Sequence, residues 1–378
     1  MFGYNSFYSH FLIFYLIYGI MILVLFSPKR DENGSFTRGN LPKVLFLALP
    51  LYLLGVLRGD TVGGDLEYYL PYFDEMCRAT NVSQIWSVSS QEPGYQLYTY
   101  LISRISPTHR AFFIGTFTLS FIGPVALIYR YSKMPFLSFV LYFAMGFYTN
   151  TFNNVRQSIA ISICFLSLSF LFNRNLRKFL FSVLLAATFH YSAIFFTLLY
   201  PLVNKRITFK RIFFMLGGGS VLYVFSSMAV MSFLLNILSF KYDSEATLLS
   251  SDGSGWGMFT LYLLILIGEL FLYSRFKNND IKKDTLSFFI YLQVLAVLFQ
   301  MYAPLFASMV RLTYYFFVPI IVVIPYLAYY FKSLRSIILS AGIALGILFL
   351  GMVYSKSDET GSNSQAVIPY VLVDKTIY

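Results

Sequence analysis

The fold is decided by residues 150–190, which read NTFNNVRQSIAISICFLSLSFLFNRNLRKFLFSVLLAATFH. Polar residues and Arg156 enter an apolar helix, basic residues at 174–178 interrupt the apolar sequence, and a second apolar run ends at His190. A charged side chain at the centre of a membrane helix costs roughly 2.5–3.5 kcal/mol on insertion scales, so such groups usually face the interior of a helix bundle. The stretch therefore indicates a membrane protein that carries a polar site.

The composition places the whole chain in the same class. It is 57% hydrophobic, 20% aromatic and only 12% charged, whereas about a quarter of the residues in a soluble protein are charged. Apolar runs of bilayer length recur, which predicts an all-α polytopic membrane protein with a single integral domain over residues 1–378. The net charge of +11 lies mainly in short loops between apolar runs. That is the pattern of cytoplasmic loops, so no nucleic-acid partner is needed to explain it.

Reading the apolar runs as spans predicts about ten full transmembrane helices. They cover residues 11–26, 44–57, 111–129, 136–148, 157–172, 212–237, 257–273, 286–303, 312–330 and 336–354. Alternation between the two sides then places a long polar loop, 58–110, and a C-terminal tail, 355–378, outside the cell membrane.

One further apolar run, 179–203, conflicts with this alternation because basic loops lie on both sides of it. A single crossing would leave the second basic cluster, 205–211, outside. A short hairpin of two half-helices, with His190 near its tip, keeps both clusters inside. We therefore expect a helical hairpin here.

This topology puts several ionisable residues on the outer side, and Arg156 is the clearest of them. Asn153 or Asn154 can cap the helix that Gln157 continues, leaving backbone N–H groups and a positive dipole end beside a guanidinium. Such a helix start is an anion site. The alternative is an interfacial arginine that reaches towards lipid headgroups. The same two interpretations hold for Arg311, and Arg58 is either a site residue or a boundary arginine.

Two carboxylates on this side are candidate general bases for a sugar hydroxyl. Asp65 follows two glycines and precedes Tyr68 and Tyr69, whose rings can stack on sugars. Glu92 begins the motif EPGY and precedes an expected amphipathic helix, 94–105. Either carboxylate could instead be a loop residue paired with a nearby arginine.

The remaining candidates are single residues. His190 is either a proton acceptor, an orienting hydrogen-bond donor or a hydrogen-bonded core residue. Glu269 stands alone in an apolar run and is interpreted as interfacial or paired. The three histidines and two cysteines show no metal-ligand spacing, so no metal site is predicted.

The order of these motifs resembles the EpsG family, which groups with Wzy-type polymerases of oligosaccharide repeat units. The resemblance spans about residues 58–316. It is carried by Gly64-Asp65 with Tyr68 and Tyr69, EPGY at 92–95, NNVRQSIA at 153–160, FHYSAI at 189–194 and RLTYYF at 311–316.

The resemblance implies a glycosyltransferase of the bacterial inner membrane, with a GT-C-like architecture, neither metal nor cofactor, and an active site facing the periplasm or cell exterior. Its substrates would be O-antigen or exopolysaccharide repeat units on undecaprenyl diphosphate, and its partners membrane lipid and a chain-length regulator protein. Arg156 and Arg311 would then bind the diphosphate with Arg58 in support, Glu92 or Asp65 would be the base, and His190 would bond a phosphate or sugar oxygen. The residues expected to bind sugar or shape the site are Tyr68, Tyr69, Tyr95, Asn153, Asn154 and Gln157.

Two other classes of function stay open. A flippase or transporter of the same lipid-linked oligosaccharide should carry ionisable groups at mid-span and on both faces. A membrane acyltransferase that modifies polysaccharide should place histidine or arginine on the inner side. The collection of candidates on one predicted side favours the polymerase.

Overall fold

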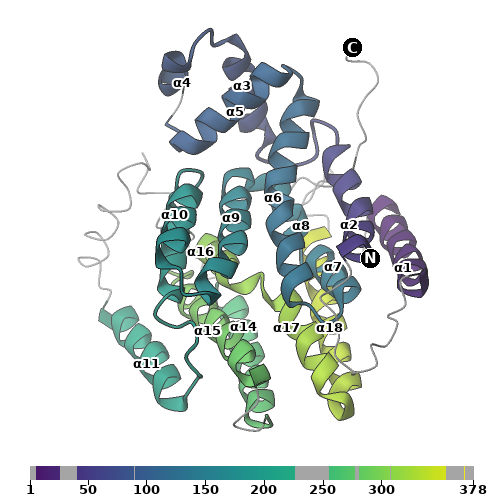
Figure 1. Ribbon diagram of the computed structural model, residues 1–378, viewed down its shortest axis with the longest axis vertical. Helices are drawn as coiled ribbons and strands as arrows, with labels where there is room; N and C mark the ends of the chain where they lie inside the picture. Colours follow the sequence, from purple (N-terminus) through teal and green to yellow (C-terminus); the bar gives the residue numbers. More distant parts are fainter. Residues whose placement is uncertain are drawn as a thin grey trace. The chain divides into compact units, whose positions relative to one another are not determined.

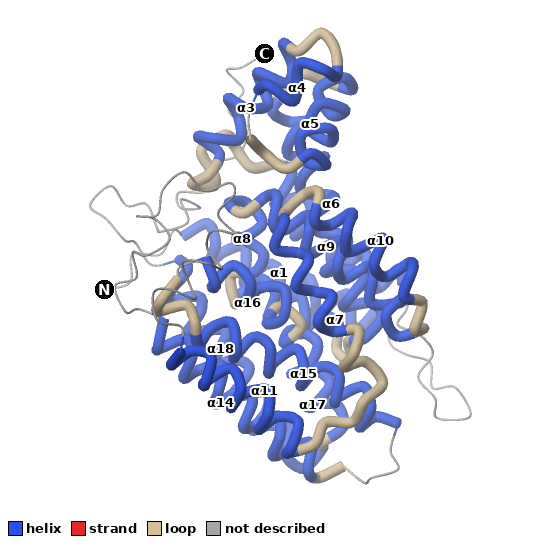
Figure 2. The backbone as a smooth tube through the Cα atoms, turned by 90° about the vertical axis from the view of Figure 1, so that its left-hand side faces the viewer, coloured by secondary structure: helices blue, strands red, loops and turns tan. Residues whose placement is uncertain are grey.

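The structure is a computed structural model, and it describes residues 6–25, 41–88, 90–225, 255–276, 281–306, 308–354 and 370. These residues form 16 α-helices and two short 3-10 helices with no strand among them (Figures 1 and 2), which confirms the all-α prediction.

Six helical segments in the described ranges are long and apolar enough to cross a membrane. They are His109–Tyr131, Val155–Phe172, Gly255–Ser274, Asp284–Met301, Ser308–Tyr330 and Lys332–Met352. Three shorter apolar helices accompany them, at His10–Leu25, Leu41–Val56 and Pro135–Ala144. A multi-pass membrane protein is therefore supported, whereas the expected number of about ten full spans is not confirmed.

The chain divides into two compact units, which are described separately. The first contains Met1–Ser167, Phe181–Ile194 and Ile321–Tyr378, and the second contains Leu168–Leu180 and Phe195–Ile320. That the chain forms a single integral domain, and that its architecture is GT-C-like, stay predictions.

Tyrosine hydroxyls hold the helices of the first unit together. Tyr15 of α1 (Ser6–Leu25) and Tyr148 of α8 (Phe147–Asn153) donate to carbonyls of α2 (Leu41–Val56), those of Leu47 and Leu51, at 2.9 and 2.7 Å. In an apolar bundle such bonds satisfy both the hydroxyl and the carbonyl.

Pro50 creates a similar requirement within α2. Because proline has no N–H, the carbonyl of Phe46 lacks its helical partner, and the Tyr18 hydroxyl donates to it at 2.9 Å.

The predicted span 136–148 is not one helix. The structure has α7 (Pro135–Ala144) and then α8, with Gly146 between them at φ 73°. Glycine adopts this left-handed conformation readily, so it ends the first helix. The new helix leads directly into α9 (Val155–Phe172) and so places Arg156. Two more helices of this unit, α17 (Ile320–Tyr330) and α18 (Arg335–Tyr354), follow later in the chain.

The polar segment 58–110 is helical rather than an open loop. It forms α3 (Leu66–Arg78), α4 (Val82–Val88) and α5 (Pro93–Ile105), which lie together in both views (Figures 1 and 2), and then enters α6 (His109–Tyr131). The expected amphipathic helix is confirmed as α5. That this segment lies outside the membrane stays a prediction.

The run 179–203 forms the expected two half-helices. The first is α10 (Leu176–Ala187), and the second is the 3-10 helix η1 (Tyr191–Leu199), with His190 between them. The chain reverses here, because the Phe179 and Tyr200 rings stack at 5.9 Å and Arg174 Nη1 donates to the Tyr200 carbonyl at 2.9 Å. The start of α10 and the end of η1 therefore both lie near the basic residues 174–178, as the hairpin prediction requires.

The second unit contains the helices α11 (Phe209–Phe225), α14 (Gly255–Ser274), α15 (Ile281–Met301) and α16 (Ser308–Phe317). The expected span 212–237 is described only as far as 225. The C-terminal tail, apart from Tyr370, lies outside the described residues.

Candidate functional site

Glu92 joins two residues that are far away in the sequence. Its Oε2 lies 2.5 Å from Arg156 Nη1, and its Oε1 lies 3.2 Å from His190 Nδ1. The side chain of Glu92 is 4% exposed and that of His190 8%, whereas that of Arg156 is 25% exposed. Three of the sequence motifs therefore meet in one cluster within the first unit, which we call the Glu92 cluster.

The backbone of α5 fixes the position of Glu92. Glu92 is the residue before the first turn, and Pro93 begins the helix with its preset φ. The Gly94 N–H donates to the Thr188 carbonyl at 2.8 Å. A Cβ at Gly94 would lie 2.1 Å from Thr188 Oγ1 and 2.9 Å from that carbonyl oxygen, so only glycine permits this approach. This contact joins α5 to the turn that carries His190.

Arg156 lies in the first turn of α9 and is bound on two sides. Its Nε donates to the Tyr69 hydroxyl at 3.5 Å, and Nη1 donates to Glu92. For Nη2 no hydrogen-bond partner is found among the described residues, and part of the side chain is exposed. The guanidinium is therefore held in place through two of its three nitrogens.

The two asparagines expected to cap α9 make contacts with residues before that helix. Asn153 Oδ1 accepts a hydrogen bond from Gly64 N–H at 2.6 Å, and Asn154 Nδ2 donates to Asn150 Oδ1 at 2.7 Å. Asn153 Oδ1 is therefore bonded to the preceding loop, and a cap of α9 by Asn154 Oδ1 stays a prediction. Gly63 beside this contact has φ 130°, which favours glycine. Asn153 thus acts by positioning the loop in front of Asp65.

The electrostatics of the cluster keep Glu92 ionised. Burial would raise its pKa, but the hydrogen bond from His190 and the charge of Arg156 outweigh burial and lower the pKa to about 2. An ionised carboxylate can only accept, so His190 Nδ1 carries the proton in this contact. Burial raises the pKa of Tyr69 and Tyr95, which stay neutral beside it. A carboxylate with this pKa is a weak proton acceptor.

Several predicted site residues lie apart from these contacts. Arg58 is 1% exposed, with its guanidinium 4.8 and 4.3 Å from the ring centres of Phe113 and Phe152. Burial lowers its pKa to about 10. Its Nε and Nη1 have no hydrogen-bond partner among the residues described. Arg58 is thus a cation held between aromatic rings, and its role on diphosphate stays a prediction.

The other predicted residues differ in accessibility. Tyr95 and Gln157 are buried, whereas Tyr68 is 71% exposed on α3. Asp65 is half-buried directly before α3 and acts electrostatically on Tyr69. Arg311 is exposed on α16 of the second unit, and its role also stays a prediction.

Sequence reasoning did not identify two contacts. Thr188, whose carbonyl accepts a hydrogen bond from the Gly94 N–H, precedes His190 by two residues, and no sequence motif marks it. Tyr69 was expected to stack on a sugar, but it is buried and bonds Arg156.

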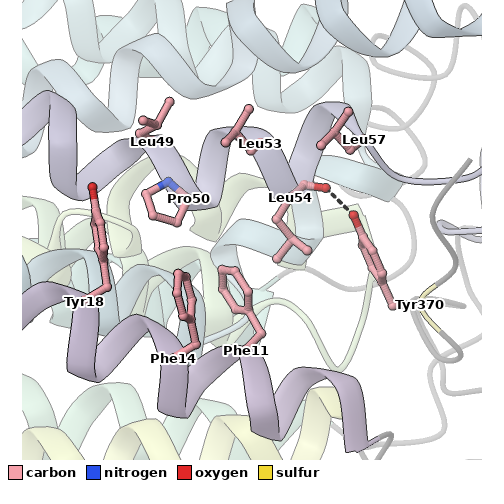
Figure 3. A pocket seen from close by; sticks show the side chains of 9 residues that line it. All are labelled: Phe11, Phe14, Tyr18, Leu49, Pro50, Leu53, Leu54, Leu57 and Tyr370. Carbon is pink, nitrogen blue, oxygen red and sulfur yellow. Dashed lines mark hydrogen bonds between the residues drawn. The ribbon is translucent and has the colours of Figure 1, made fainter.

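A cavity of about 370 Å³ in the first unit lies elsewhere (Figure 3). It is lined by apolar side chains of α1 and α2 and by Tyr370, whose hydroxyl donates to the Leu54 carbonyl at 2.5 Å. None of the Glu92 cluster lines it.

No group of three or more metal-ligating side chains is found within the described ranges. Comparison with known families gives a match to the EpsG family over residues 43–372. Comparison with curated proteins and with solved structures gives no match. The family match covers most of the chain and includes every residue of the Glu92 cluster, so the chain belongs to the EpsG family.

Proposed function

We propose that this protein polymerises oligosaccharide repeat units carried on undecaprenyl diphosphate, for an O-antigen or exopolysaccharide. Block glycosyl transfer would take place on the outer face of the bacterial inner membrane. Membership of the EpsG family suggests a membrane polysaccharide polymerase-like function. The observation that carries the proposal is the Glu92 cluster, in which a partly exposed arginine and a carboxylate-bound histidine lie side by side.

The reaction breaks one bond and forms another. A hydroxyl oxygen of the acceptor's terminal sugar attacks the anomeric carbon of the donor chain. The bond from that carbon to the lipid diphosphate breaks, and lipid diphosphate leaves with the electron pair. Negative charge develops on the leaving group, so catalysis requires a cation or hydrogen-bond donors there.

Arg156 supplies that stabilisation in our proposal. A guanidinium stays charged at any physiological pH and binds phosphate through directed N–H groups. Nη1 and Nε are held by Glu92 and Tyr69, so Nη2 is the donor directed to the diphosphate. Arg311, exposed on α16, is the second proposed ligand, and Arg58 the supporting one.

His190 is the better candidate for the base. Nδ1 donates to Glu92, so the lone pair of the neutral imidazole is on Nε2, as in other carboxylate–histidine pairs. Glu92 then positions both partners instead of accepting the proton itself, because its pKa is about 2. The proton of the acceptor hydroxyl would pass to His190 Nε2. Asp65 is the alternative base.

Tyr68 is the aromatic ring on which we propose that a sugar stacks. Of the three tyrosines expected at the site, Tyr69 and Tyr95 are buried, whereas Tyr68 exposes most of its ring. A sugar face can stack on an exposed aromatic ring without displacing protein side chains.

The test is polymerisation by the purified full-length chain in liposomes with lipid-linked repeat units, resolved as a ladder. The wild type should form a ladder, and Arg156→Ala should leave single-repeat material. Arg78→Ala, an exposed arginine at the end of α3, is the matched control and should give the wild-type ladder. Full-length polymer from Arg156→Ala would rule out the leaving-group role. Translocation of the lipid-linked unit without any ladder from the wild type would favour the flippase.

A further inference from the structure

Helix α5 exposes a stripe of apolar side chains and buries polar side chains together with Tyr95, Tyr100 and Ile102. Leu97, Leu101 and Ile105 are 40%, 51% and 85% exposed and recur every four residues, so they form one stripe. Gln96, Thr99 and Ser103 are buried on the opposite side. An amphipathic helix in water turns its polar face outward. The outward face of α5 is instead apolar except for Arg104, whose guanidinium donates to the carbonyls of Met76 and Cys77.

Three buried polar groups of α5 donate hydrogen bonds within the protein. Gln96 Nε2 donates to the Gln91 carbonyl at 2.7 Å, and the hydroxyls of Thr99 and Ser103 donate to helix carbonyls at 2.8 and 2.7 Å. These three donors are therefore satisfied without water.

The neighbouring helix α3 has the ordinary pattern. Leu70, Phe73 and Met76 are buried, whereas Glu67 and Glu75 are exposed. The two helices pack on each other, with the rings of Tyr72 and Tyr95 stacked at 5.8 Å. The exposed face of α3 thus includes charged residues, whereas that of α5 includes the apolar stripe.

The contact between α5 and α6 gives the depth of the apolar stripe. Tyr98 of α5 donates to the carbonyl of Gly115 at 2.8 Å. Gly115 lies six residues after His109, so α5 is attached about 9 Å below the start of α6. A helix of 23 residues is about 34 Å long, close to the roughly 30 Å of the hydrocarbon core. Ile114 of α6, the residue before Gly115, is also exposed.

We propose that α5 is an interfacial membrane helix whose stripe of Leu97, Leu101 and Ile105 is inserted among the phospholipid chains of one leaflet. Interfacial helices bury their apolar face about 5–10 Å into the boundary between headgroups and chains, which matches the depth of this attachment. The segment 58–110 is then partly embedded, and Glu92 at the start of α5 is held near the level of lipid phosphates. The inference depends on α6 spanning the membrane and not on the proposed reaction.

Tryptophan fluorescence can test this proposal, because the sequence contains only two tryptophans, Trp86 and Trp256. In a Trp86→Phe/Trp256→Phe background, Leu101→Trp places the fluorophore in the stripe, and Glu75→Trp places it on the charged face of α3. The full-length variants are reconstituted in phosphatidylcholine vesicles with chains brominated near the headgroup. Fluorescence of Leu101→Trp should be quenched at least about threefold more than that of Glu75→Trp.

Equal quenching of the two variants would overturn the proposal, whether the stripe is covered by water or by a second copy of the chain. Ile105→Trp in the same background guards against a local disturbance at position 101, because Ile105 is the most exposed residue of the stripe. Its quenching should match that of Leu101→Trp. The quenching experiment does not depend on polymerase activity. Strong quenching of Leu101→Trp in a protein that forms no polymer would therefore count against the proposed function and not against insertion of α5.

Discussion

At the scale of single residues, the cluster depends on how Glu92 divides its two oxygens. One oxygen holds the Arg156 guanidinium and the other holds the His190 ring. A buried carboxylate without partners would be costly, and so would the arginine without its carboxylate. The three residues therefore stabilise one another, and removal of one changes the position and charge of the other two.

This coupling predicts a dependence of stability on pH. The pKa of Glu92 falls from its ordinary value of 4.5 to about 2 on folding. A carboxyl group with a lowered folded pKa stabilises the protein fully above its unfolded pKa, and this stabilisation is lost as the pH falls through the folded value. Glu92→Gln should lower stability by about 1–3 kcal/mol at pH 7. The gap between the melting temperatures of wild type and variant should stay constant down to about pH 5 and close between pH 4.5 and 2.

Glu75→Gln is the matched control for this experiment. Glu75 is exposed on α3, so this substitution should change stability by no more than about 0.5 kcal/mol and show no narrowing gap. A gap for Glu92→Gln that stays constant down to pH 2 would contradict the ionised state of Glu92 in the folded protein.

The geometry of Arg156 predicts that charge alone is insufficient. Lysine can replace the charge, but a single ammonium cannot donate at once to Glu92, Tyr69 and a phosphate from fixed positions. Arg156→Lys should therefore reduce the rate of polymerisation about 10–100-fold, from the loss of one or two charge-assisted hydrogen bonds. Initial rates of ladder formation measure this, and Arg78→Lys should retain the wild-type rate. Wild-type rates for Arg156→Lys would mean that only the charge matters.

At the scale of secondary structure elements, α5 and the hairpin meet at one glycine. The approach of Gly94 to Thr188 places the first turn of α5 against the turn that carries His190. The residues of the cluster come from α5, α9 and the hairpin, so their geometry depends on this contact.

Gly94→Ala should separate these elements. The new methyl group would overlap both the side chain and the carbonyl of Thr188, so the backbone must shift, at about 1–3 kcal/mol. Melting temperature and polymerase rate should both fall. Gly94→Ala/Thr188→Ala should not recover the loss, because the carbonyl clash remains.

Gly257→Ala provides the comparison, since a Cβ there meets nothing within 4 Å. It lies inside α14, where alanine is favoured over glycine by about 1 kcal/mol. The variant should be at least as stable as the wild type. If Gly94→Ala behaves in the same way, the close contact does not position the site.

The sequence predicted the elements unevenly, for physical reasons. Hydropathy locates most of the apolar helices because bilayer-length runs are a strong signal, as at α6 and α9. It does not find α3 and α4, which are amphipathic or short. It also joins α7 and α8, because the break at Gly146 depends on one backbone angle.

The side of the membrane on which the site residues lie could also be predicted from the sequence. Positive charges in loops fix which ends share a side, which is why Glu92, Arg156 and His190 could be grouped before their contacts were known. The partners could not be predicted. Whether an asparagine caps α9 or binds Gly64 depends on a loop packed from 89 residues away.

At the scale of the whole molecule, the hairpin decides how the chain is threaded through the membrane. If the run 179–203 crossed once, the basic residues before and after it would lie on opposite sides. Because α10 leads away from the basic residues 174–178 and η1 leads back towards them, Lys178 and Lys205 should lie on the same side of the membrane. The positive-inside rule assigns that side to the cytoplasm.

Thiol labelling of intact cells tests this threading. In a Cys77→Ser/Cys164→Ser background, which removes both native cysteines, Ser87→Cys reports on the exposed end of α4, and Lys178→Cys and Lys205→Cys report on the two basic clusters. A membrane-impermeant maleimide should label only Ser87→Cys, and the two lysine variants should react only after the cells are permeabilised. Labelling of Lys205→Cys but not Lys178→Cys in intact cells would establish a single crossing. The hairpin would then be absent from the membrane form, and His190 could not approach Glu92 from the turn described here.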